Sequence, residues 1–184
     1  MHTHTTTTSE GRKITVVDDL FDFADRTLIM NRIYQSQFSF GASWDAQVSD
    51  FCATSTLGTP WDQQQWDDFG LERHPNWHKI RPLLAGVSQQ RAWVNLHTGR
   101  DTYRYHVDHE APGAISMLFY PNLKWLSDWD GQTIFKSADL SHIEYTSEYV
   151  PGRIVLFDSR IPHKAVHPNW EAVGFRAILN AVFY

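Results

Sequence analysis

Residues 105–125 read YHVDHEAPGAISMLFYPNLKW, a polar pair followed by a turn and an apolar run. Within this stretch, His106 and Asp108 stand two positions apart. Side chains at i and i+2 of a strand project to the same face, so we expect this imidazole and this carboxylate to point together. The run Ala114–Tyr120 predicts a second, buried strand beyond the turn at Pro112-Gly113.

A metal site is the first interpretation of this pair. A His-x-Asp pair arises by chance about once in a chain with ten histidines, so the context must decide. His163 follows the apolar strand Arg153–Phe157 and could reach the pair across a narrow barrel mouth, with His167 as the alternative third ligand. Two histidines and one carboxylate form the facial triad of non-heme iron, which leaves three coordination positions open. We therefore predict His106, Asp108 and His163 as metal ligands and as the catalytic centre.

Arg176 opens the last apolar segment, Phe175–Tyr184. An arginine is costly to bury in such a strand without a partner. Its guanidinium suits bidentate binding of a carboxylate, so we expect an anionic ligand there. The alternative is a salt bridge to an internal aspartate or glutamate.

The residue pattern from Arg91 onward predicts a mainly β protein. Short alternating or β-branched segments recur between turns that contain Gly, Pro-Gly, Pro-Asn or Asp-Gly. The expected strands are Trp93–His97, Tyr103–Asp108, Ala114–Tyr120, Thr133–Phe135, Glu144–Tyr149, Arg153–Phe157, Ala165–His167 and Phe175–Tyr184. Two helices precede them, which favours a double-stranded β-helix, a cupin-like jelly roll with flanking helices.

The first half of the chain gives less regular signals. The run Thr5–Thr8 lies in a polar stretch, and we expect residues 1–13 to be a disordered tail before a single domain at 14–184. Asp18 or Asp19 could cap a helix that runs to about Gln37. Residues 37–44 could be a strand, 59–70 a long loop, and 75–84 a second helix.

Composition narrows the class of partner. A net charge of −5 argues against extended nucleic acid, which requires a clustered basic surface. The single cysteine, Cys52, cannot form an internal disulfide, so we expect a reducing, cytoplasmic setting. No apolar run approaches a membrane span. The sequence gives no indication of oligomeric state.

Taken together, these motifs resemble the 2-oxoglutarate- and Fe(II)-dependent dioxygenases, most closely their prolyl-4-hydroxylase-like branch. The resemblance covers roughly residues 91–184 and is carried by four motifs in order. They are YHVDHEAPGAISMLFYPNLKW, DGQTIF, PGRIVLFDSRIPHKAVHP and FRAILNAVFY. It implies that His106, Asp108 and His163 bind the iron. Related halogenases replace the carboxylate with a small residue, so Asp108 favours hydroxylation or a related oxidation.

The resemblance also assigns a cosubstrate pocket. Arg176 matches the basic residue that pairs with the distal carboxylate of 2-oxoglutarate, and Tyr120 matches a tyrosine that often contacts the same group. Asn95 stands where related enzymes place an amide near the metal-proximal carboxylate. Leu96 occupies the place of the tyrosine that the branch usually has about ten residues before the first ligand.

The activity that the resemblance implies is oxidative decarboxylation of 2-oxoglutarate to succinate and CO2, coupled to hydroxylation of a C–H bond. The cofactors would be Fe(II), 2-oxoglutarate and O2, with ascorbate as a stimulating reductant. The substrate would be a small molecule, an amino acid or a peptidyl proline. Two alternatives remain: a cupin-like metal-binding protein without oxygenase activity, and a nucleotide or nucleic-acid oxygenase on the same scaffold.

Overall fold

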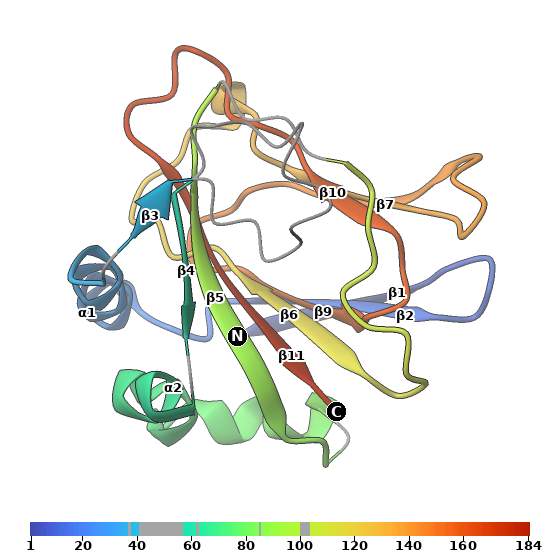
Figure 1. Cartoon of the computed structure of the whole chain (residues 1–184), viewed down its shortest axis with the longest axis horizontal. Helices are drawn as coiled ribbons and strands as arrows, with labels where there is room; N and C mark the ends of the chain where they lie inside the picture. The colour runs from blue at the N-terminus through green and yellow to red at the C-terminus, as the bar shows by residue number, and fades with distance from the viewer. Residues whose placement is uncertain (37, 41–56, 62, 85, 100–103) are drawn as a thin grey trace.

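Two antiparallel β-sheets face each other in the computed structural model, which describes residues 1–36, 38–40, 57–61, 63–84, 86–99 and 104–184 (Figure 1). The large sheet has the strand order β1-β2-β9-β6-β11-β5-β4-β3, and the small sheet has the order β10-β7-β8. Strands of the large sheet are β1 (His2–Thr7), β2 (Lys13–Asp18), β3 (Ser39–Phe40), β4 (Leu57–Trp61), β5 (Gln89–His97), β6 (Ile115–Phe119), β9 (Ile154–Asp158) and β11 (Arg176–Phe183). Those of the small sheet are β7 (Thr133–Lys136), β8 (Ile143–Ser147) and β10 (His163–Ala165).

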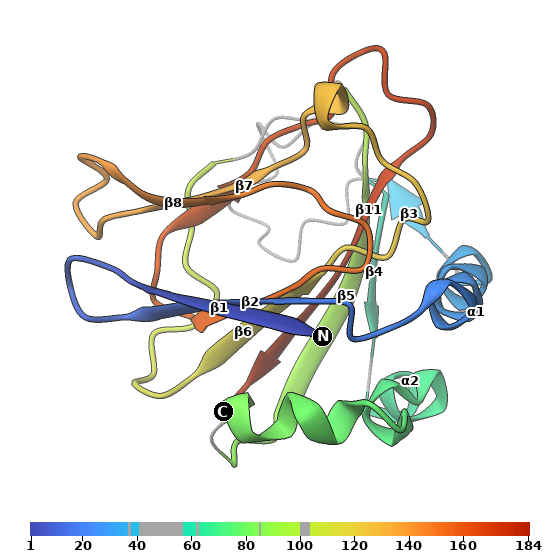
Figure 2. The same cartoon turned by 180° about the vertical axis from the view of Figure 1, so that it is seen from behind.

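The helices α1 and α2, with the 3-10 turns that follow α2, cover one face of the large sheet, and the small sheet covers the other (Figure 2). The helical elements are α1 (Phe23–Tyr34), α2 (Gln63–Phe69) and four 3-10 turns, η1 (Leu71–Arg73), η2 (Trp77–Lys79), η3 (Arg81–Leu84) and η4 (Ser127–Trp129). The helix-facing core contains Leu179 and Phe183, whereas the core between the sheets contains Ile178 and Phe157. The alternation along β11 therefore divides its side chains between two cores, and every residue of β11 is buried.

Strand β11 has a fixed register against β5, with Arg176 opposite His97 and Asn180 opposite Trp93. Directly opposed residues of an antiparallel pair share a face. The side chains of Arg176, Ile178, Asn180 and Val182 therefore point between the sheets, on the face that we call the inner face. This face forms the floor of the candidate site.

The predicted disordered tail is wrong, because β1 lies within residues 1–13. It pairs with β2 from His2↔Asp18 to Thr7↔Lys13, and β2 in turn pairs with β9. Threonine favours strands, since its β-branched side chain packs well on a pleated surface. Hydrogen bonds also hold the turn between β1 and β2. Ser9 N donates to Glu144 at 3.1 Å, and Glu10 accepts from Ala138 N at 3.1 Å.

The N-terminal helix is shorter than the sequence predicts. Asp22 caps it through a reciprocal capping box with Asp25, so α1 begins at Phe23, not at Asp18 or Asp19. Asp18 instead ends β2. The helix packs through Ile29, Met30 and Ile33.

Two other predictions for this region are corrected. The expected loop at 59–70 contains the end of β4 and all of α2, whose Trp66 and Phe69 are buried. The expected helix at 75–84 is the pair of 3-10 turns η2 and η3, although Trp77, Ile80 and Leu84 are buried as their spacing predicts. Of the strand expected at 37–44, Ser39–Phe40 form β3 and Phe38 precedes it without regular structure, whereas residues 37 and 41–44, like Cys52, lie outside the described residues.

The strand expected at 103–108 is not a regular strand in its described part. His106 makes one isolated bridge with His163, and Asp108 lies in a bend. Tyr103 is outside the described residues. Within the described chain, no helix has the length and apolar character to cross a membrane.

Candidate active site

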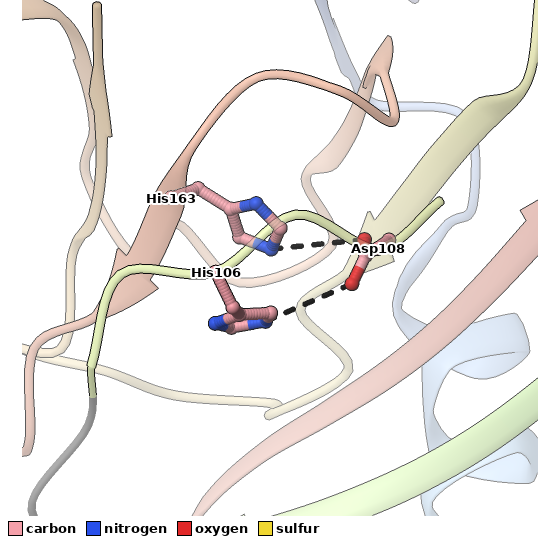
Figure 3. Close-up of side chains that lie close together, drawn as sticks. All are labelled: His106, Asp108 and His163. Atoms are coloured by element: carbon pink, nitrogen blue, oxygen red, sulfur yellow. Dashed lines mark ion pairs between the residues drawn. The ribbon is translucent and has the colours of Figure 1, made fainter. Parts of the chain in front are cut away.

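Three side chains from two distant segments converge on one point. The ligand atoms of His106, Asp108 and His163 all lie within 4.8 Å of one another, and in the described part of the chain this is the one cluster suited to a metal ion (Figure 3). The Nε2 atoms of His106 and His163 each lie 3.7 Å from a different oxygen of Asp108. These distances are too long for hydrogen bonds and suit ligands that meet at an ion between them.

Main-chain contacts fix this convergence. His106 and His163 exchange two backbone hydrogen bonds of 3.1 and 2.9 Å, which bring the two imidazoles side by side. Asp108 N donates to Ser159 O at 3.0 Å, and the Arg91 guanidinium donates to the Asp108 carbonyl. The bend after His106 therefore does what a continuous strand would do: it turns both side chains of the pair to one side.

Hydrogen bonds also select the ring tautomers. Nδ1 of His163 lies 3.1 Å from Ile161 O, and Nδ1 of His106 lies 3.1 Å from Arg104 O. A carbonyl can only accept, so each Nδ1 carries a proton, and in the neutral ring the Nε2 lone pair faces Asp108. This is the state in which imidazole binds a metal.

Burial keeps His163 neutral. It lowers the pKa of this histidine to about 4, with Asp108 acting in the opposite direction and His106 adding to the decrease. The ring lies against Phe157 and Phe135, at centroid distances of 4.7 and 5.8 Å. His106, by contrast, is half exposed, so the cluster is closed on one side and open on the other. His167, the alternative ligand, is exposed and outside the cluster.

Arg176 is fully buried on the inner face at the start of β11. Its Nε donates to Gly131 O at 2.5 Å, Nη1 to His97 Nδ1 at 3.0 Å, and Nη2 to Thr133 Oγ1 at 3.2 Å. A guanidinium has five N–H groups, so one remains on each terminal nitrogen. Among the described residues, no carboxylate forms an ion pair with Arg176, and the alternative of an internal salt bridge has no support.

Aromatic and hydroxyl groups complete the surroundings of Arg176. Its guanidinium carbon lies 5.0 Å from the ring centre of Tyr149 and 5.5 Å from that of Tyr120. The Tyr120 hydroxyl donates to Thr133 Oγ1 at 2.9 Å. Thr133 therefore accepts from both residues and links the Tyr120 hydroxyl to the guanidinium.

Asn122 explains why the motif Tyr120-Pro121-Asn122 accompanies the arginine. Its Nδ2 donates to Phe175 O at 2.9 Å, and its Oδ1 accepts from Ala177 N at 2.9 Å. The amide thus holds the backbone on both sides of Arg176. Tyr149 buttresses the same point through hydrogen bonds to Asn122 and Ala177, and burial raises the pKa of its hydroxyl.

Asn95 lies on the inner face of β5, opposite Ile178. Its side-chain amide is oriented so that the oxygen faces a donor and the nitrogen faces an acceptor. The oxygen then accepts from Trp93 Nε1 at 3.2 Å, and the nitrogen donates to Val94 O at 3.3 Å. Its contact with a cosubstrate carboxylate stays a prediction. Leu96 points the other way, into the helix-facing core.

The donor set fits a hard divalent ion and a diacid. Two neutral imidazoles and one carboxylate are the ligands of the non-heme iron triad, and they leave part of the coordination sphere for other ligands. Arg176 offers a pair of N–H groups to a carboxylate in the same interior. A molecule with a chelating end and a distal carboxylate would engage both groups.

Several solved structures are similar to this chain in fold. A prolyl-4-hydroxylase from Pseudomonas putida matches with a TM-score of 0.63 and 17% identity, over 92% of this chain and 91% of that one. A prolyl hydroxylase from Trichoplax adhaerens, in complex with a hypoxia inducible factor peptide fragment, matches with a TM-score of 0.63 and 17% identity, over 93% and 83%. SnoN, a non-heme α-ketoglutarate-dependent epimerase from nogalamycin biosynthesis, matches with a TM-score of 0.67 and 14% identity, over 93% and 77%.

These likenesses show the fold. The chain has the double-stranded β-helix found in prolyl-4-hydroxylases and in other α-ketoglutarate-dependent non-heme enzymes, so the predicted fold class is confirmed. No protein-family model matches the sequence. No curated protein matches it either.

Sequence reasoning missed Thr133, Gly131 and Arg91 as parts of the site. Thr133 has a weak signal, because it alternates with the inward Phe135 on a strand that was predicted. Gly131 acts through its carbonyl, and Arg91 through its reach to Asp108, so neither has a side-chain pattern that the sequence alone displays.

Proposed function

We propose that the protein is a non-heme Fe(II) oxygenase that couples oxidative decarboxylation of 2-oxoglutarate, to succinate and CO2, with hydroxylation of a substrate C–H bond. One observation carries this proposal. The interior between the sheets holds a two-histidine, one-carboxylate cluster together with a fully buried arginine that has two unused N–H groups and no carboxylate partner among the described residues.

In this proposal, each residue has a defined task. His106, Asp108 and His163 hold the iron, which when bound supplies the activation of O2 and the oxidising power. Arg176 binds the distal carboxylate of 2-oxoglutarate, and Tyr120 and Thr133 orient that carboxylate. Phe135 and Phe157 keep water from the buried side of the centre. The exposed side of His106 is where the substrate would approach.

Two kinds of substrate are supported by the similar structures. The Trichoplax adhaerens structure contains a peptide fragment, and SnoN belongs to nogalamycin biosynthesis. We propose a small molecule, an amino acid or a peptidyl proline as the substrate, and O2 as the oxidant. The net charge of −5 makes extended nucleic acid the less favoured partner.

The decisive experiment is an assay of the purified protein with Fe(II), ascorbate, O2 and 2-oxoglutarate, in which succinate and CO2 are measured. A panel of amino acids, proline-containing peptides and small metabolites is then scored by the increase in succinate. Asp108→Ala is the control for contaminating activity. A protein that binds Fe(II) but forms no succinate with any mixture would be the metal-binding cupin-like protein instead.

A further inference from the structure

Asn180, in the middle of β11, has a buried polar group that the described chain does not satisfy. The residue is 6% exposed, and its Nδ2 is buried without a hydrogen-bond partner among the described residues. Buried polar groups in folded proteins are almost always hydrogen-bonded, and an unmade bond is unfavourable. An amide N–H₂ at this place therefore points to a partner that the chain itself does not supply.

The sheet register places this amide on the floor of the candidate site. Asn180 lies opposite Trp93 of β5 and Leu118 of β6, so its side chain points to the inner face between the sheets. It is four residues beyond Arg176, which keeps both side chains on that face. Both polar groups thus line the same interior from one strand.

The far end of this row leads to the metal cluster. Two residues beyond Asn180 stands Val182, which pairs with Arg91 of β5. The Arg91 guanidinium donates to the carbonyl of Asp108, so this end of the inner face reaches the ligand segment. Asn180 therefore lies along the row between the diacid anchor, Arg176, and the side chain that contacts Asp108.

From this placement we infer that Asn180 Nδ2 donates a hydrogen bond to the metal-proximal carboxylate of the 2-oxo acid. The inference rests on the proposed function and assigns the second end of its cosubstrate. A carboxylate accepts a charge-assisted hydrogen bond, which would satisfy the orphan N–H only when the cosubstrate is bound. Asn95, the amide expected in this role, already has Trp93 and Val94 as partners for its two polar atoms.

Two truncated ligands separate the two ends of the diacid. The compound 4-oxopentanoate keeps the distal carboxylate and the keto group but has a methyl group in place of the metal-proximal carboxylate. The compound 2-oxobutanoate keeps the metal-proximal end and lacks the distal carboxylate. Binding of both compounds and of 2-oxoglutarate is measured by calorimetry on the Mn(II)-loaded protein, so that the readout is affinity without turnover.

We expect Asn180→Leu to weaken 2-oxoglutarate and 2-oxobutanoate about tenfold, equal to about 1.4 kcal/mol, and to leave 4-oxopentanoate unchanged. Asn180→Asp should weaken the same two ligands further, because it brings a second carboxylate beside the first. Arg176→Ala should show the reverse pattern, with loss for 2-oxoglutarate and 4-oxopentanoate only. Asn95→Leu is the matched comparison, because it removes the equivalent side-chain amide from the neighbouring strand β5.

The melting temperature of the ligand-free protein provides the second readout. Asn180→Leu replaces an unsatisfied amide with an apolar group of similar size, so its melting temperature should equal or exceed that of the wild type. A lower melting temperature, or equal weakening of all three ligands, would show a structural role and overturn the inference. So would a full effect of Asn95→Leu with none of Asn180→Leu. Failure of the wild type to bind 2-oxoglutarate at all would instead overturn the proposed function.

Discussion

Arg176 and His97 face each other across the β5–β11 pair, and the guanidinium donates through Nη1 to His97 Nδ1 at 3.0 Å. The guanidinium cannot accept, so the imidazole contributes a lone pair at this nitrogen. The residue opposite the buried cation is thus a neutral ring, which orients the guanidinium without neutralising it. The positive charge stays available to an incoming carboxylate.

This pair predicts a dependence of stability on pH. Burial, and then the charge of Arg176, hold the pKa of His97 well below its ordinary value of 6.5. The unfolded chain binds a proton there below pH 6.5 and the folded chain does not, so the contribution of His97 is present above pH 6.5 and is lost as the pH falls below it. We expect the free energy of unfolding of the metal-free protein to decrease between about pH 7 and pH 5.

His97→Asn is the matched variant, because its Oδ1 can replace Nδ1 as the acceptor and does not titrate. Urea unfolding of both proteins across this range should show a smaller decrease for the variant. His163 titrates in both proteins, so the difference isolates His97. Parallel pH profiles would contradict the prediction.

Replacing Arg176 should weaken the binding of 2-oxoglutarate more than it slows the chemical step. Arg176→Ala removes two charge-assisted hydrogen bonds to a carboxylate, and we expect the KM for 2-oxoglutarate to rise about 100-fold, or about 3 kcal/mol. Arg176→Lys keeps the positive charge but loses the planar guanidinium. Its KM for 2-oxoglutarate should therefore lie between those of the wild type and Arg176→Ala. Arg160→Ala, which removes an arginine paired with Asp158 outside the cluster, is the control. An unchanged KM in Arg176→Ala would remove this residue from the proposed role.

The metal cluster predicts a sharp distinction between two neighbouring histidines. His163→Ala and Asp108→Ala should lose Fe(II) or Mn(II) binding and all succinate formation, because each removes one of three ligands. His167→Ala should bind metal like the wild type, since His167 lies outside the cluster. Metal content after equilibrium dialysis measures this directly, and tight binding by His163→Ala would exclude the triad.

Gly131 offers a test, through the backbone, of the packing around Arg176. Its φ is +91°, and an added Cβ would lie 3.2 Å from both Arg176 Cδ and Trp125 Cζ2. Gly113 has a similar φ of +86°, with nothing within 4 Å of an added Cβ. We expect Gly113→Ala to lower the free energy of unfolding by about 1 kcal/mol, because of backbone strain alone.

Gly131→Ala should cost about 1–3 kcal/mol more, because it also crowds the buried arginine, and it should raise the KM for 2-oxoglutarate. Chemical denaturation and cosubstrate titration of the two variants separate strain from crowding. Equal losses of stability with an unchanged KM would show that Gly131 does not shape the anchor.

The β core and the candidate ligands could be predicted from the sequence because their signals are local. Alternation of apolar residues marks strands such as β6 and β9, and the two-residue spacing of His106 and Asp108 survives even though their segment is a bend. The proximity of His163 followed only from the resemblance and from its place after an apolar strand. The isolated bridge between His106 and His163 supplies the physical reason.

What could not be predicted depends on contacts distant in sequence. The strand β1 looks like a polar tail because its stabilisation comes from β2, which is itself anchored on β9 about 140 residues later. The partners of Arg176 come from two segments that are both far from it in sequence, one at His97 and the other at Gly131 and Thr133. No local sequence pattern encodes such a set. The sequence therefore predicted an anionic ligand for Arg176 but not the groups that hydrogen-bond to its guanidinium.

The position of β11 has a consequence for synthesis. It is the last strand in chain order, yet it lies in the middle of the large sheet between β6 and β5. While residues 176–183 are still inside the ribosome, the large sheet is therefore in two separate halves, and neither contains the arginine. The halves can join only after residues 176–183 have left the exit tunnel, so the ability to bind an anion at Arg176 depends on the emergence of this strand.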